Sequence, residues 1–70
     1  MPQRFLTLAD VAEALAVSVA QVRTLVRSGE LRAIQVGPKK VWRIEDTALE
    51  QYISEQYERT KARIEAEQHP

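Results

Sequence analysis

Near the start of the chain, the hydrophobic positions repeat with the period of an α-helix. Four apolar residues follow one another at i, i+3, i+4 and i+7: Leu8, Val11, Ala12 and Leu15. This spacing places them on one face of a helix. Thr7 precedes the run, and Asp10 lies three residues after Thr7, which is the spacing of a capping box. The pattern therefore predicts a first helix over about residues 8–15.

A second helical pattern begins after a link of only two residues, Ala16 and Val17. Ser18 and Gln21 have the spacing of another capping box, and Gly29 supplies the left-handed residue that commonly ends a helix. The inward stripe consists of Val22, Leu25 and Val26, with Val19 at its edge. Two short helices joined so tightly predict a helix-turn-helix unit.

The second helix has an outer side suited to DNA. Steps of about 100° per residue put Ala20, Thr24 and Arg27 opposite the apolar stripe, with Gln21 and Arg23 on its two flanks. Small side chains beside arginines permit close approach to a groove. We interpret residues 18–29 as a DNA-recognition helix, whose candidate contacts are Ser18, Ala20, Gln21, Arg23, Thr24 and Arg27. The alternative is the ordinary polar face of a surface helix.

Two short alternating segments, residues 33–36 and 41–44, flank a turn-like sequence, Gly-Pro-Lys-Lys, and predict a β-hairpin. The apolar residues expected to face the helices are Ile34, Val36, Trp42 and Ile44. We expect Arg43 to point outward beside Lys39 and Lys40. These three cations predict a wing that binds the phosphate backbone or the minor groove.

A third helix is expected to begin at Glu45 and Asp46, where acidic groups favour the positive end of the helix dipole. Leu49, Tyr52 and Ile53 provide its inward face. Residues 54–68 contain no Gly or Pro, so the helix is predicted to continue to about residue 67. We thus expect a winged domain over residues 1–53 and a helical extension over residues 54–70.

The extension contains a short coiled-coil pattern. Residues spaced 4, 3 and 4 apart form a possible dimer seam: Ile53, Tyr57, Thr60 and Ile64. Only two heptads fit, fewer than the three or four that make such a pattern reliable. Two interpretations therefore stay open, a homodimer through this helix and a solvated tail.

The net charge is zero, with 10 basic and 10 acidic residues, but the charges are unevenly distributed. Residues 19–44 carry a net charge of +5, whereas residues 45–70 carry −4. A basic middle can hold an anionic partner while the acidic end limits non-specific attachment.

Several other classes of protein are not expected. There is no cysteine for a disulfide or a thiolate metal site. No apolar run approaches the ~18 residues of a membrane span, and the start lacks a signal-peptide core, so we expect a cytoplasmic protein. No Ser-His-acid set or phosphate loop is present, and His69 stands alone. We therefore expect neither an enzyme nor a bound cofactor or metal.

Several segments together resemble a known family. They are residues 6–12, 15–18, 22–23, 25–31, 36–37, 42–44 and 48–50, of which Arg-Ser-Gly-Glu-Leu at 27–31 is the most specific. The chain resembles small excisionase-type DNA-binding proteins, a group related to the winged helix-turn-helix domains of mercury-resistance-regulator (MerR) type activators. The resemblance implies a compact winged helix-turn-helix fold, with the residues named above on its recognition helix and wing. In MerR-type regulators, a long C-terminal helix pairs antiparallel to form the dimer.

The expected fold is mainly α-helical with a small β-hairpin: helix, turn, recognition helix, two-stranded wing and long C-terminal helix. The expected function is sequence-specific binding of double-stranded DNA. Such a protein would be a small transcription regulator or a recombination directionality factor of the excisionase kind, with a recombinase or another regulator as a possible partner. The alternatives are a protein-interaction module and a DNA-architectural module with little sequence preference.

Overall fold

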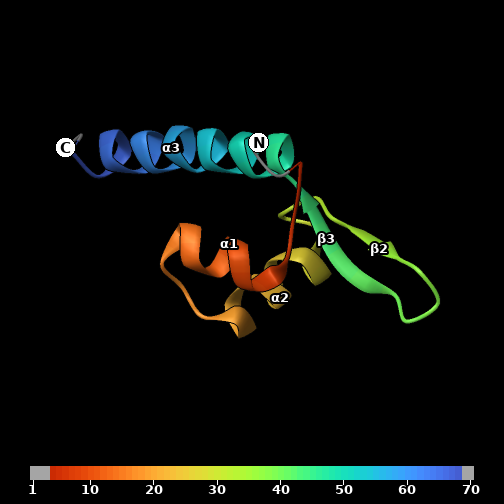
Figure 1. The fold of residues 1–70 in the computed structure, drawn as a ribbon. Helices are drawn as coiled ribbons and strands as arrows, with labels where there is room; N and C mark the ends of the chain where they lie inside the picture. Colours follow the sequence, from red (N-terminus) through yellow and green to blue (C-terminus); the bar gives the residue numbers. More distant parts are fainter. Residues whose placement is uncertain (1–3, 69–70) are drawn as a thin grey trace.

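The computed structural model describes residues 4–68, so the lead-in residues 1–3 and His69 lie outside the described part of the chain. The elements follow the order β1 (Phe5–Leu6), α1 (Leu8–Leu15), α2 (Val19–Ser28), β2 (Ile34–Val36), β3 (Val41–Glu45) and α3 (Asp46–Gln68). Figure 1 shows the short helices α1 and α2 packed together, with the β2–β3 hairpin projecting beside them. This arrangement confirms the winged helix-turn-helix fold.

Hydrogen-bonded caps explain where α1 and α2 begin. The Oγ1 atom of Thr7 accepts a hydrogen bond from the Asp10 backbone N–H at 3.0 Å, and the Asp10 carboxylate accepts one from the Thr7 N–H at 3.0 Å. Ser18 and Gln21 form the same reciprocal pair at the start of α2. Both predicted capping boxes are confirmed.

Left-handed residues end both helices. Ala16 has φ 56° and ψ 44°, and Gly29 has φ 84° and ψ 0°. A left-handed residue turns the chain sharply after the last helical turn, and it lets backbone N–H groups bond the final carbonyls. At the end of α1, the Val17 N–H donates to the Ala12 carbonyl at 3.0 Å. A link of residues 16–18 is therefore enough to reverse the chain between α1 and α2.

The sheet has a third strand that the hydrophobic pattern does not predict. Its order is β1-β3-β2, and β1 pairs antiparallel with β3 through Phe5 opposite Glu45 and Leu6 opposite Ile44. The expectation that Glu45 begins the third helix is therefore wrong, because pairing with β1 keeps this residue in β3. The Glu45 carboxylate also forms an ion pair with the Arg4 guanidinium, at 3.3 Å. Asp46 begins α3, as expected.

The register of the hairpin corrects a second expectation. The cross-strand pairs are Ile34 with Arg43, Gln35 with Trp42, and Val36 with Val41. Residues directly opposite each other on paired strands project from the same face. Ile34 and Val36 therefore share the outer face with Arg43 and are 51% and 45% exposed. Trp42 and Ile44 do face the helices, and Ile44 is fully buried.

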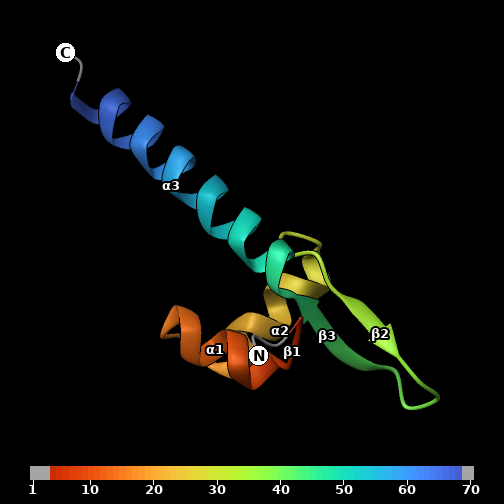
Figure 2. The ribbon, with the colours of Figure 1, turned by 45° about the horizontal axis from the view of Figure 1, so that its top comes forward.

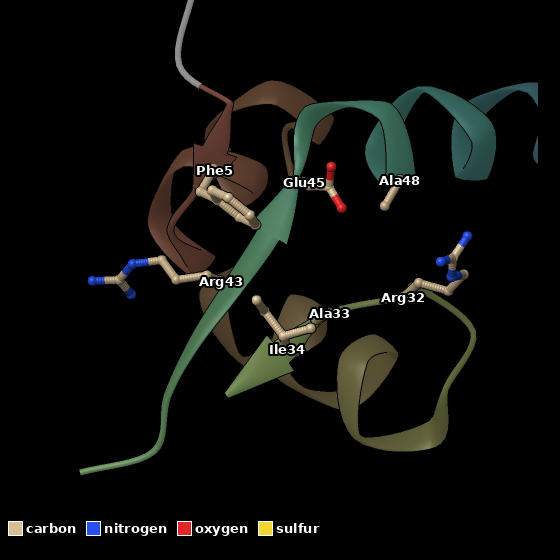
Figure 3. Close-up of a pocket in the computed structure, with 7 residues that line it drawn as sticks. All are labelled: Phe5, Arg32, Ala33, Ile34, Arg43, Glu45 and Ala48. Atoms are coloured by element: carbon tan, nitrogen blue, oxygen red, sulfur yellow. The ribbon is translucent and has the colours of Figure 1, made fainter. Parts of the chain in front are cut away.

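Figure 3 shows this outer face, where Phe5 and Ile34 lie on the same side of the sheet with Arg43 and Glu45. Together with Arg32, Ala33 and Ala48, these residues line a small pocket of about 70 Å³. The Arg43 side chain extends away from the pocket. Apolar side chains are thus found on both faces of the wing.

The core lies between the two short helices, β3 and the first turns of α3. Its buried residues are Val11, Ala12, Val22, Val26, Leu31, Ile44 and Leu49. The short elements thus bury their apolar faces against one another around Ile44, the one fully buried residue of β3. This packing positions α2 relative to the wing.

Helix α3 is continuous over 23 residues, as predicted, and projects well beyond the core (Figure 2). Leu49 is buried and Tyr52 and Ile53 pack against the core, whereas every residue from 57 to 68 is exposed. The longest dimension of the molecule is accordingly 54 Å. No helix within residues 4–68 combines the length and the apolar character needed to cross a membrane.

Candidate nucleic-acid interface

Every residue predicted to lie on the recognition side of α2 is exposed: Ser18, Ala20, Gln21, Arg23, Thr24 and Arg27. On the opposite side of the helix, Val22 is 0% and Val26 is 6% exposed. The helix therefore contributes one side to the core and leaves the other open to a partner.

Three of these exposed side chains, Ser18, Gln21 and Thr24, already make hydrogen bonds at the start of the helix or within it. The Gln21 Oε1 atom accepts from the Ser18 backbone N–H at 3.0 Å and from the Ser18 hydroxyl at 3.3 Å. The Thr24 hydroxyl donates to the Ala20 carbonyl at 3.1 Å. A glutamine that reads adenine uses both its amide oxygen and its amide nitrogen. For Gln21, that contact would require the capping box to open.

An open groove separates α2 from the wing. Its volume is about 410 Å³, and its floor and walls come from the start of α1, from α2 and from the hairpin. The lining residues are Thr7, Leu8, Ala9, Val19, Arg23, Lys39, Lys40, Val41, Trp42 and Arg43. We call this the cationic groove, because four of its ten lining residues are basic and none is acidic. It brings Arg23 together with all three predicted wing cations, whereas Arg27 does not line it.

The lysines of the wing tip lie in a turn with a distinctive backbone conformation. Gly37 and Lys40 both have positive φ, 77° and 52°, and the Lys40 N–H donates to the Gly37 carbonyl at 3.1 Å. Both Lys39 and Lys40 are exposed. Arg43 is half-buried, and its Nη1 atom donates to the Trp42 carbonyl at 2.7 Å.

The cations of the groove have little internal compensation. Among residues 4–68, no carboxylate lies within 4.0 Å of the charged atoms of Arg23, Lys39 or Lys40. Unpaired cations on one concave surface create a positive potential, which attracts phosphate groups and is screened by salt. The geometry therefore suits a polyanion that lies between α2 and the wing.

The other flank of α2 faces a more apolar cavity of about 470 Å³, to which Gln21 and Thr24 contribute. An adjoining cavity of about 250 Å³ is lined partly by Ile53, Tyr57 and Thr60. Three of the four seam residues thus share one surface, and the fourth, Ile64, lies further along α3. Tyr57 is 74% and Ile64 is 44% exposed.

Val19 is one of six groove residues that were not among the predicted DNA contacts, and it is the one that belongs to α2. It was expected at the edge of the apolar stripe, yet it is 39% exposed and lies in the cationic groove. The sequence did contain one signal for this location, because Val19 is the first residue of the predicted second helix. No cluster of three or more potential metal ligands occurs within residues 4–68.

The chain matches a known protein family. A family model described as a helix-turn-helix domain matches residues 5–57, which is most of the 70-residue chain. No curated protein and no solved structure matches the chain. The matched region includes the two capped helices, the wing and the part of α3 that packs on the core.

Proposed function

This chain belongs to the helix-turn-helix domain family, of the excisionase type, and we propose that it binds double-stranded DNA with sequence preference. The family is a DNA-binding family, and this membership supports DNA binding as the general activity of this chain. In this proposal the protein acts as a small transcription regulator or as a recombination directionality factor, since both need the same module. A recombinase or another regulator would be its protein partner.

The observation that carries the proposal is the cationic groove. Arg23 from α2 and Lys39, Lys40 and Arg43 from the wing line one concave surface without an acidic neighbour in the groove. In the proposed complex, the N-terminal end of α2 enters the major groove, as the second helix of a helix-turn-helix does. The phosphates beside that groove then occupy the space between α2 and the wing, where lysines can neutralise them.

The different roles proposed for α2 and for the wing follow from the chemistry of their side chains. Arg23 and Arg27 are exposed and can donate two hydrogen bonds to a guanine edge, or contact flanking phosphates. Lys39 and Lys40 are point charges on a loop and act through the release of counterions. Base preference should therefore depend on α2, and salt dependence on the wing.

Salt titration with a matched control tests this division. A duplex is first selected from a random library, and its dissociation constant is measured by fluorescence anisotropy at several salt concentrations. We expect Lys39→Gln plus Lys40→Gln to weaken binding to selected and random duplexes alike and to reduce the salt slope by up to about two.

The control variant is Lys61→Gln plus Arg63→Gln, which removes the same charge from the distal part of α3. It should change the salt slope much less than the wing variant. Equal slopes for the two double variants would show that binding does not use the cationic groove. Equal affinity of the protein for selected and random duplexes would exclude sequence preference and favour the architectural alternative.

We also propose that two copies associate through α3. One small module presents few contacts, so a dimer would raise its effective affinity for paired sites. Support comes from Tyr57 and Ile64, the large apolar side chains exposed on the projecting part of α3, and from the cavity beside Ile53 and Thr60. Spacing of 4, 3 and 4 keeps these four residues on one side of α3.

Sedimentation equilibrium measures this association directly. Tyr57→Glu plus Ile64→Glu should convert a dimer into a monomer, because it places two charges in the apolar seam. Ala62→Glu plus Ala66→Glu adds the same charges on the opposite side of α3 and should leave the dimer intact. A monomeric wild-type protein at all concentrations would exclude the dimer.

A further inference from the structure

We infer that Val19 recognises the 5-methyl group of a thymine in the major groove. The preferred DNA site would then contain a thymine that faces the first turn of α2. This inference rests on the proposed function, since it assigns a specificity contact to the same DNA-binding surface. It concerns a side chain that would otherwise be counted as part of the core.

Val19 is neither one of the buried core residues nor one of the partly buried residues packed against them. It is 39% exposed, whereas Val22 and Val26 on the inner side of the same helix are 0% and 6% exposed. A single exposed valine is ordinary on a protein surface. Its location is informative, because Val19 lies in the cationic groove together with Arg23 and the wing lysines. It is therefore an apolar side chain on the surface that carries the phosphate-binding charges.

The polar groups near the start of α2 are largely occupied. The Ser18 hydroxyl accepts from the Gln21 backbone N–H at 3.1 Å, and the Gln21 amide oxygen is held by Ser18 in return. The Thr24 hydroxyl donates to the Ala20 carbonyl. In the first turn of α2, the exposed side chains that make no such hydrogen bond are those of Val19 and Ala20, and both consist of carbon.

Thymine is the base that matches such a surface. In the major groove, its 5-methyl group distinguishes it from the other bases as an apolar contact for small side chains. Residues at the N-terminal end of a recognition helix are those that reach base edges, and Val19 is the first residue of α2. A β-branched side chain in a helix has one strongly preferred rotamer, so little side-chain freedom is lost on contact.

Replacement of thymine by deoxyuridine removes only the methyl group and tests the inference. A duplex is selected from a random library, and each thymine is replaced in turn, with affinity measured by fluorescence anisotropy. At one position we expect the wild-type protein to bind the deoxyuridine duplex about fourfold more weakly, equivalent to about 0.8 kcal/mol for one buried methyl group. For Val19→Ala, the ratio of the two affinities at that position should fall to about one.

Val17→Ala is the matched control, since Val17 is also exposed, at 36%, but lines the cavity on the other flank of α2. This variant should keep the wild-type preference for thymine. Alanine is the best helix former, so Val19→Ala is not expected to disturb the start of α2.

The outcomes separate this inference from the proposed function. If the protein prefers the selected duplex but no thymine position responds to deoxyuridine, the inference is overturned and the proposed function stands. The same holds if Val19→Ala keeps the wild-type preference. A protein that binds no duplex overturns both.

Discussion

Replacing Gln21 with alanine tests whether this side chain serves the helix or the DNA. Its amide oxygen accepts hydrogen bonds from the Ser18 backbone N–H and hydroxyl, at 3.0 and 3.3 Å, on an exposed part of α2. An exposed hydrogen bond falls at the low end of the usual range, so we expect a loss of about 0.5 kcal/mol in the free energy of unfolding. For a domain of this size, the melting temperature should fall by about 2–4 °C.

Thermal unfolding followed by circular dichroism provides the assay, with Ser18→Ala as the companion variant. Ser18→Ala removes the hydroxyl that accepts from the Gln21 N–H, which typically costs about 1 kcal/mol. Because both residues belong to one capping box, the double variant should lose less than the sum, with a coupling free energy of about 0.5 kcal/mol. The base preference of Gln21→Ala is measured separately, with competitor duplexes that differ at single base pairs.

We expect Gln21→Ala to keep the wild-type preference at every base pair, since its amide is engaged in the cap. An unchanged melting temperature together with a relaxed preference at one base pair would refute this reasoning. It would show that Gln21 leaves the capping box and contacts a base when DNA binds.

Three further substitutions test the interface and the fold. Arg23→Ala removes an exposed cation of the groove and should weaken binding to the selected site by about 1–3 kcal/mol in an anisotropy titration, with relaxed preference at one base pair. Equal loss on every duplex would show a phosphate contact only. Gly29→Ala adds a Cβ that meets no atom within 4 Å, so its cost is the left-handed backbone alone, about 1 kcal/mol, measured by urea unfolding. A stability equal to that of the wild type would contradict this assignment. Ile44→Ala removes most of the fully buried side chain of β3 and should cost about 2–5 kcal/mol in the same urea experiment. A cost below about 1 kcal/mol would mean that the core does not depend on Ile44.

The amino-acid sequence was sufficient to predict α1 and α2 because their signals are local. Each capping box joins residues three positions apart, and Gly29 ends α2 through its own backbone conformation. The hydrogen bonds that define these ends form between near neighbours, so they do not depend on how the rest of the chain packs. The exposure of the recognition residues followed from the same helical period.

The wing was predicted as a hairpin, but its inner and outer faces were only partly assigned. The loop over residues 37–40 sets Val36 opposite Val41, and that register places Ile34 on the same face as Arg43. Loop length was therefore a usable signal for the register. Apolar residues occur on both faces of the wing, however, so alternation alone does not indicate which face is buried. A shift of one residue exchanges the two faces.

Only the tertiary structure decided the pairing of β1 with β3 and the formation of the cationic groove, because each depends on elements distant in sequence. β1 forms because Phe5 and Leu6 meet β3, and this pairing keeps Glu45 in the strand. The cationic groove exists because the start of α1, the flank of α2 and the wing tip converge around a shared core. Local sequence determined which residues form α1 and α2, whereas packing determined where α3 begins and that Val19 lies in this groove.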